Sequence, residues 1–241
     1  MRPELRFRAM GTTCSLFGDG DLAGGERWVR SVAARVTRFD ESSELSWLNA
    51  ASAWVAISPE LEQLLCASLR AFEMSGGLVN VAVLPSMLAI GYTRPLAHGP
   101  TASQLDLAHS APLLPNVLNV KRGRARLAPK VRIDLGGIAK GWMADQLAAR
   151  LGDHVLVNLG GDLYARGEWP VAIAGKTYLL RNLGAATSST RKRRWGDLHH
   201  LIDPRTGLPA TSRLDEVSVV ADTALDAEVL AKTVLISDRA A

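Results

Sequence analysis

Cysteine is scarce in this sequence, with Cys14 and Cys66 as its two cysteines among 241 residues. Two thiols without metal-ligand spacing exclude a disulfide-rich framework and a cysteine-bound metal cluster. Both cysteines stand among apolar neighbours. The sequence therefore predicts two buried, free thiols.

Long apolar runs are also missing. No stretch approaches the roughly 20 apolar residues that a membrane-spanning helix requires. Residues 1–10 are charged where a signal peptide would have an apolar run. The sequence as given thus predicts a protein without a membrane span that works in the cytoplasm. A segment upstream of Met1 would instead allow a location outside the cytoplasm.

Aromatic residues and net charge are low as well. Aromatic side chains make up 5% of the sequence and do not alternate with the basic runs, as a base-stacking surface requires. The formal net charge of +4 is too small to indicate nucleic-acid binding by itself. No nucleic-acid partner is therefore expected.

What the sequence does contain is the pattern of a globular α+β protein. Helical spacing and capping predict helices at 28–39, 137–151 and 223–236. A further helix is predicted to begin at 59, capped by Ser58, and to end at the glycines at 76–77. Residue alternation and turn signals predict strands at 5–17 (interrupted at 10–12), 117–120, 124–127, 131–133, 155–159, 169–173 and 177–180. Residues 95–115 are irregular and predict a connection between two halves. Mixed strands with segregated helices favour an α+β fold.

Two adjacent histidines form the first candidate site. His199 and His200 lie on a predicted short strand, so their side chains point to opposite faces and one of them can enter a site. Imidazole carries a proton near neutral pH, and the four cations at 191–194 can attract a phosphate group. The alternative is that both histidines are surface residues at a strand end.

A glycine-marked helix start forms the second candidate. The segment DLGGIAKG at 134–141 leads from a strand into a helix through adjacent glycines. Missing side chains let a ligand approach the backbone, and the helix N-terminus favours anions. The segment is neither a Walker loop nor a dinucleotide fingerprint. Its alternative role is tight packing of helix against strand.

The last predicted helix carries the third candidate. At 100° per residue, Glu228 and Lys232 lie opposite the polar stripe, which comprises Asp222, Asp226, Thr233 and Ser237. An ion pair on the buried face of a helix costs desolvation. We therefore expect Glu228 and Lys232 to face a functional cavity; the alternative is an exposed Glu–Lys pair.

Taken together, these segments resemble the FAD:protein FMN transferases, the ApbE-like flavin transferases. The resemblance covers nearly the whole chain in the family's order. It is carried by residues 10–12, 43–45, Asn49, 77–80, Pro85, 134–141, 158–162, 187–188, 200–207 and 227–235.

The resemblance implies one domain over residues 1–241, built from two related T-fold-like halves with mixed or antiparallel sheets, packed helices and FAD in a cleft between the halves. It also implies an activity. Such enzymes split FAD, attach FMN through a phosphoester to a Thr or Ser hydroxyl of a target protein, and release AMP.

The resemblance further implies roles for single residues. His200 matches the catalytic histidine, and the carbonyl of Ala139 matches a Mg²⁺ ligand. Positions that contact the flavin nucleotide match Met10, Asn49, Asn80, Gly136, Lys140, Trp142 and Thr187.

The predicted metal site departs from the family at its last two positions. The family usually has Asp and, four residues later, Thr, where this chain has Glu228 and Lys232. A protonated ammonium cannot ligate a metal. Either Lys232 supplies part of the metal's charge, or it pairs with Glu228 and abolishes the site. Two alternatives to FMN transfer follow: a non-catalytic FAD-binding protein with a degenerate metal site, and an FAD pyrophosphatase.

Overall fold

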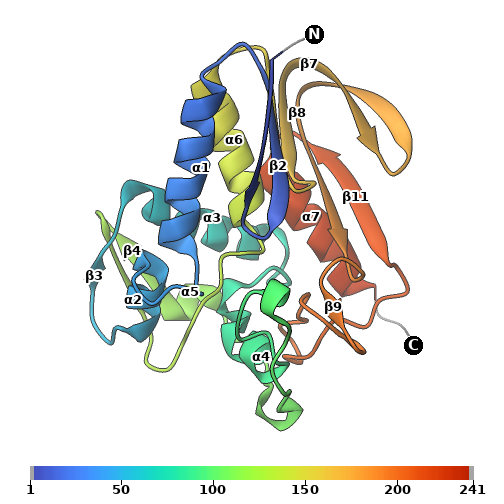
Figure 1. Cartoon of the computed structure of the whole chain (residues 1–241). Helices are drawn as coiled ribbons and strands as arrows, with labels where there is room; N and C mark the ends of the chain where they lie inside the picture. Colours follow the sequence, from blue (N-terminus) through green and yellow to red (C-terminus); the bar gives the residue numbers. More distant parts are fainter. Residues whose placement is uncertain (1–2, 239–241) are drawn as a thin grey trace.

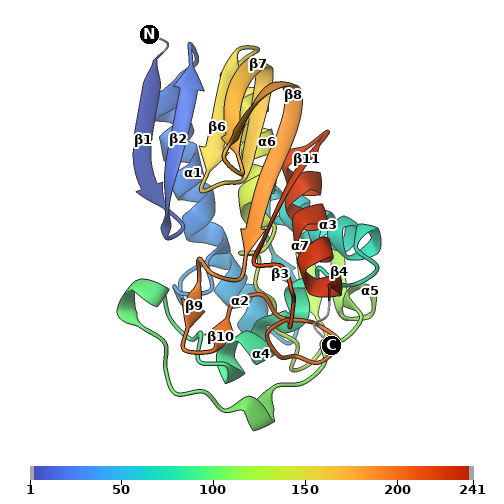
Figure 2. The same ribbon diagram turned by 90° about the vertical axis from the view of Figure 1, so that its right-hand side faces the viewer.

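The computed structural model describes residues 3–238. Its centre is a six-stranded sheet in the order β1-β2-β6-β7-β8-β11, in which every neighbouring pair is antiparallel (Figure 2). The strands are β1 (Glu4–Ala9), β2 (Thr12–Gly18), β6 (Val155–Leu159), β7 (Leu163–Ile173), β8 (Lys176–Ser189) and β11 (Glu216–Ala221). The predicted strand break at residues 10–12 is the turn between β1 and β2, and the predicted α+β fold is confirmed.

Three helices cover one face of this sheet (Figures 1 and 2). They are α1 (Leu22–Val36), α6 (Ala139–Leu151) and α7 (Ala224–Ser237). The first turn of α7 rests directly on β8, because a Cβ atom added at Gly184 would lie 2.1 Å from the backbone nitrogen of Ala224. This close approach fixes the position of α7, and hence of the polar side chains that it carries.

A smaller layer packs below these helices. Its longest helix is α3 (Pro59–Met74), which begins as predicted: the Ser58 hydroxyl accepts a hydrogen bond from the Leu61 N–H, and Pro59 occupies the first turn. The layer also contains α2 (Glu44–Ala50), α4 (Leu84–Ala89), α5 (Leu114–Val117) and the three-stranded sheet of β3 (Val55–Ala56), β5 (Arg124–Leu127) and β4 (Leu118–Lys121). Among residues 3–238, no helix combines the length and apolarity needed to cross a bilayer.

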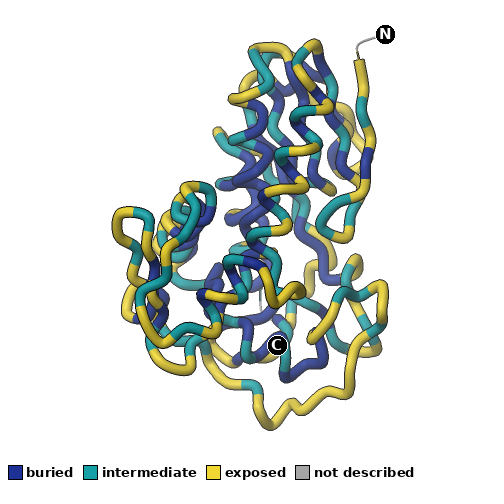
Figure 3. Tube along the Cα trace, turned by 60° about the vertical axis from the view of Figure 1, so that its left-hand side comes forward, coloured by how far each residue is buried: buried dark blue, intermediate teal, exposed yellow. Residues whose placement is uncertain are grey.

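The predicted connection at 95–115 is confirmed as largely irregular. It contains two short 3-10 turns, Leu96–His98 and Leu105–Leu107, and much of it is exposed (Figure 3). The six-stranded and the three-stranded sheet each pair a strand from before this connection with one that follows it, since β2 pairs with β6 and β3 with β5. The division of one domain into two related halves stays a prediction.

Several predicted elements differ from the structure in their bounds or are absent. The strands predicted at 169–173 and 177–180 are parts of the longer strands β7 and β8. The helix predicted at 28–39 begins at Leu22 and ends at Val36, because the Asp21 carboxylate accepts a hydrogen bond from the Gly24 N–H and caps the helix earlier. The strand predicted at 131–133 joins none of the three sheets in the described chain. The amide of Asn49 takes both backbone groups of Ile133 instead, at 2.8 and 2.9 Å.

The prediction of two buried thiols is half wrong. Cys14 is buried on β2, whereas Cys66 is exposed on α3. The inward face of α3 is occupied by Leu61, Leu64, Leu65 and Ser68. Cys66 points away from that face.

Candidate functional site

A cavity of about 670 Å³ lies where the two layers meet. Its walls come from the turn after β1, the segment entering α6, the end of β8, the residues around the β9–β10 hairpin (Arg194–Trp195 and Leu198–His199), and α7. It brings together nine of the predicted site residues: Met10, Asn80, Gly136, Ala139, Lys140, Thr187, His200, Glu228 and Lys232.

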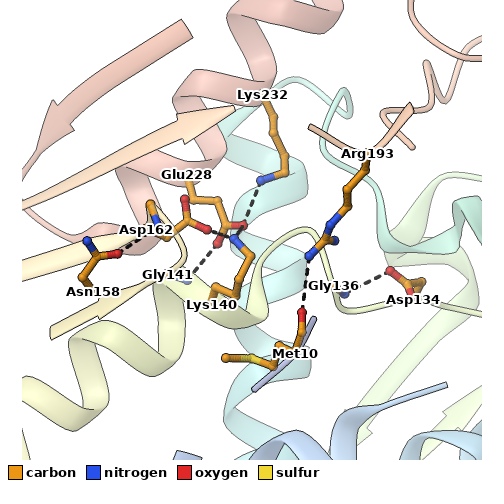
Figure 4. A network of polar contacts seen from close by, with 11 residues as sticks. Met10, Asp134, Gly136, Lys140, Gly141, Asn158, Asp162, Arg193, Glu228 and Lys232 are labelled. Carbon is orange, nitrogen blue, oxygen red and sulfur yellow. Dashed lines mark hydrogen bonds and ion pairs between the residues drawn. The ribbon is translucent and has the colours of Figure 1, made fainter. Parts of the chain in front are cut away.

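Glu228 is the centre of a polar network at one wall (Figure 4). It is fully buried, at 0% exposure. Its Oε1 atom accepts hydrogen bonds from Lys232 Nζ at 2.9 Å and Lys140 Nζ at 3.5 Å, and its Oε2 atom accepts from the Gly141 N–H at 2.8 Å. Lys140 also pairs with the buried carboxylate of Asp162. The prediction that Glu228 and Lys232 face a cavity is confirmed.

The network forms because α6 and α7 approach each other closely at Gly141, which has no side chain. A Cβ atom added at Gly141 would lie 2.7 Å from the Ala224 carbonyl oxygen and 2.8 Å from Glu228 Oε2. One turn further along α6, the Asp145 carboxylate accepts the N–H groups of Ala224 and Leu225 and so caps α7. Burial raises the pKa of Asp145 to about 6, against the effect of those two hydrogen bonds.

Burial and charge act against each other at the network. Burial lowers the pKa of Lys140 to about 8, although the Glu228 carboxylate opposes this shift. Burial would raise the pKa of Glu228, but the ammonium groups of Lys140 and Lys232 outweigh it and hold that pKa below its ordinary value. Glu228 is therefore an ionised carboxylate at neutral pH.

The two histidines differ as their opposite faces predict. His199 is buried, and its Nε2 atom lies 3.0 Å from the Ala210 carbonyl oxygen. His200 lines the cavity, and its buried Nδ1 atom has no hydrogen-bond partner among residues 3–238. Burial, with the nearby charges of Arg193 and Lys232, holds the pKa of His200 well below its ordinary value. The alternative that both are surface residues is wrong.

The sequence model of the ApbE family matches residues 10–241 of this chain. The chain belongs to the ApbE family. Two FAD:protein FMN transferases are similar to it in sequence: that of Haemophilus influenzae is 26% identical over 94% of this chain and 78% of the relative, and that of Treponema pallidum is 31% identical over 79% of this chain and 64% of the relative.

Solved structures show the same fold. The ApbE protein of Thermotoga maritima has a TM-score of 0.84 at 24% identity and covers 98% of this chain and 87% of its own. The flavin transferase ApbE of Vibrio cholerae has a TM-score of 0.78 at 22% identity, with the same two coverages. The α+β architecture described above is therefore the ApbE fold.

Two of the nucleotide contacts implied by the ApbE resemblance, Asn49 and Trp142, are not among the described residues that line the cavity, and their roles stay predictions. The side-chain amide of Asn49 donates a hydrogen bond to the Ile133 carbonyl oxygen and accepts one from the Ile133 N–H. Trp142 is buried beside Trp28, with ring centroids 6.1 Å apart. Both residues support the walls of the cavity and do not face its interior.

Asn49→Ala is therefore expected to lower the free energy of unfolding by about 1–3 kcal/mol, because it leaves two backbone groups of Ile133 without their partner. The affinity for FAD should stay unchanged. Chemical denaturation and FAD titration measure the two quantities, with the exposed Asn119→Ala on β4 as the matched control. A loss of FAD affinity without a loss of stability would restore Asn49 as a direct contact.

The predicted magnesium site of the ApbE resemblance does not fit the residues present. Both carboxylate oxygens of Glu228 already accept hydrogen bonds, and the Lys232 ammonium occupies the position of a ligand without being able to serve as one. Within residues 3–238, no group of three or more His, Cys, Asp or Glu side chains could hold a metal ion. The reaction steps proposed for these residues therefore do not involve Mg²⁺.

Two of the four cations at 191–194 line the cavity. Lys192 and Arg193 line it, and Arg193 Nη2 lies 3.4 Å from the Met10 carbonyl oxygen. Arg191 pairs with Asp215, and Arg194 lies 3.6 Å from Asp197. The run therefore contributes two cations to the site instead of four.

Sequence analysis missed a second ion pair in the cavity wall. Arg38 Nε lies 2.8 Å from Asp134 Oδ2, and the guanidinium stacks on the rings of Phe39 and Tyr92 at 4.2 and 4.6 Å from their centroids. Arg38 and Asp134 lie 96 positions apart in the sequence. No local pattern links them.

The position of Met10 carried a signal that sequence analysis left unused. Met10 and Gly11 both adopt a positive φ, 51° and 70°, in the two-residue turn between β1 and β2. Such turns join antiparallel strands closely and favour Gly or Asn. A methionine in this strained conformation is typical of a functional position, and Met10 does line the cavity.

Proposed function

We propose that this chain cleaves FAD and transfers its FMN part to a Thr or Ser hydroxyl of a target protein, with AMP as the released product. The similarity to two FAD:protein FMN transferases supports this proposal. The observation that carries it is one cavity in which three features meet: the glycine-marked start of α6, the Glu228 network, and the His200 Nδ1 atom, which has no hydrogen-bond partner in the described part of the chain.

The cavity offers separate surfaces to the parts of a dinucleotide. Phe39, Tyr92 and Leu96 supply an apolar wall suited to a flat ring system. The backbone at Gly136 and Gly137, next to the N-terminus of the 13-residue helix α6, suits an anionic pyrophosphate. We place the flavin ring against the first surface and the pyrophosphate against the second.

The reaction is an in-line displacement at the phosphorus of the FMN part. The acceptor hydroxyl oxygen forms a new P–O bond, and the bond from that phosphorus to the bridging oxygen of the pyrophosphate breaks. AMP leaves with the bridging oxygen and the electron pair of the broken bond. The hydroxyl proton passes to Nδ1 of His200, which is free to accept it because a lowered pKa keeps the imidazole neutral.

Lysine side chains would stabilise the charge that develops on the leaving phosphate. Lys140 and Lys232 both line the cavity, and each is held in place by an acidic partner. A cation held before the reaction begins needs no reorganisation during it. Lys140 and Lys232 would therefore stabilise the transition state more than the bound, unreacted nucleotide.

A mass measurement tests the proposal. The protein is incubated with FAD and a peptide that carries an acceptor threonine, and a matched peptide with valine at that position is the control. A peptide heavier by FMN, together with AMP in the threonine sample alone, supports transfer. Release of AMP without an adduct would assign FAD hydrolysis, and intact bound FAD would assign a binding protein; either result contradicts the proposed function.

On the acid side of the pH profile, the rate of transfer should fall only below the ordinary pKa of histidine. Because the pKa of His200 in the folded protein lies well below its ordinary value, its base form persists when an exposed histidine would already be protonated. We expect kcat/KM to stay constant as pH falls through 6.5 and to decline only below it. A pH–rate profile measures this, and a decline centred at or above pH 6.5 would contradict the assignment of His200 as base.

A further inference from the structure

Lys232 differs from an ordinary surface lysine in where its charge is held. Its side chain is 12% exposed, and its Nζ atom lies 2.9 Å from Oε1 of the fully buried Glu228. Its stem runs along the start of α6, because a Cβ atom added at Gly137 would lie 3.5 Å from Lys232 Cε. The ammonium therefore lies between the carboxylate of α7 and the glycines that enter α6.

The charges around this ammonium balance. Two carboxylates, Glu228 and Asp162, face two ammonium groups, Lys140 and Lys232. Without Lys232, these four side chains would keep one net negative charge where a pyrophosphate would bind. With Lys232 the group of four is neutral, and a lysine ammonium has three N–H donors, of which Glu228 occupies one.

We infer that the Lys232 ammonium, fixed by Glu228, is the resident cation of this site, and that the chain binds the pyrophosphate of its nucleotide without a divalent metal ion. The inference rests on the proposed function for the identity of the nucleotide. It makes Lys232 a phosphate-binding and charge-neutralising residue, where the ApbE resemblance leads one to expect the oxygen ligand of a metal.

The first test uses the unmodified protein. The dissociation constant of FAD, measured from flavin fluorescence, should differ by less than about twofold between EDTA and millimolar Mg²⁺. Electron paramagnetic resonance of added Mn²⁺ should detect no stoichiometric binding to the protein without nucleotide. Stoichiometric Mn²⁺ binding, or FAD binding that EDTA abolishes and Mg²⁺ restores, would overturn the inference.

Two variants of Lys232 sharpen the test. Lys232→Met removes the charge and supplies no oxygen, so FAD binding should weaken about tenfold in both EDTA and Mg²⁺. Lys232→Thr frees the Glu228 carboxylate and adds a hydroxyl, so FAD binding should weaken in EDTA and recover about tenfold with Mg²⁺, together with new Mn²⁺ binding. Lys176→Met, at an exposed position in the β7–β8 hairpin, is the matched control.

The outcomes separate this inference from the proposed function. A protein that forms no FMN adduct under any condition refutes transfer, whereas the Mn²⁺ and FAD binding measurements still decide the role of Lys232. Thermal unfolding identifies any variant that fails to fold. If a variant does not fold, the measurements on the wild-type protein still decide the inference. FAD affinity that is the same in Lys232→Met and the wild type would overturn it.

Discussion

His200→Ala is expected to lower the rate of FMN transfer about 100- to 10,000-fold, the usual contribution of a positioned general base. His200 lines the cavity with a buried nitrogen that has no partner among residues 3–238. Burial keeps its imidazole neutral. Removing the imidazole leaves the proton of the attacking hydroxyl without an acceptor, while the surfaces that hold FAD remain.

Two measurements separate chemistry from binding in this variant. Mass spectrometry of the threonine peptide gives the rate of transfer, and flavin fluorescence gives the affinity for FAD, which should change little. His154→Ala, at an exposed histidine, is the matched control and should keep full activity. Transfer by His200→Ala at the wild-type rate would remove His200 from the mechanism.

Glu228→Gln is expected to lower the free energy of unfolding by about 3–5 kcal/mol at neutral pH. The substitution keeps the shape of the side chain but removes the charge that Lys140 and Lys232 share. Both lysine side chains are largely buried, at 15% and 12% exposure, so water cannot fully replace the lost carboxylate. Chemical denaturation measures the effect.

The effect of Glu228→Gln should depend on pH. The pKa of Glu228 is lower in the folded protein than in the unfolded chain, so its stabilising contribution is fully present above the ordinary carboxyl value. That contribution is lost as pH falls through the folded-state value. The difference in stability between wild type and variant should therefore shrink in acid.

The same helix offers the control. Asp226 pairs with Arg70 at the surface of α7, where the arginine side chain is 56% exposed. An exposed pair contributes about 0–1 kcal/mol, so Asp226→Asn should cost far less than Glu228→Gln. Equal losses from both variants would contradict the account of a buried, charge-balanced network.

Much of the fold could be predicted from the sequence where the signal is local. Ser58 followed by Pro59 gave the start of α3, Gly152 gave the end of α6, and the strand at 124–127 has the predicted bounds. Capping, helix termination and alternation each act within a few residues. These features required no knowledge of distant contacts.

Long-range pairing could not be predicted in this way. The extended segment at 131–133 looks like a strand, yet Asn49 takes its backbone groups from 84 positions away. Asp134 belongs to the predicted helix start at 134–141, but its partner Arg38 lies in the chain before α2. Tertiary packing brings such partners together. Their separation along the chain follows no fixed spacing, so a single sequence does not reveal them.

The last helix shows both sides of sequence reasoning. Its angular pattern correctly predicted that Glu228 and Lys232 face inward, because a helix has a fixed turn per residue. The magnesium site implied by the resemblance does not fit the residues present, because an ammonium stands at Lys232, where the family usually has an oxygen ligand.

A crystal structure of His200→Ala with FAD tests the central claim most directly. The account predicts intact FAD in the 670 Å³ cavity, with its pyrophosphate contacting the backbone at Gly136 and Gly137 and the Lys232 ammonium. The space left by the missing imidazole should face the phosphorus of the FMN part. FAD bound elsewhere on the chain, or a pyrophosphate remote from Lys232 and position 200, would contradict the account.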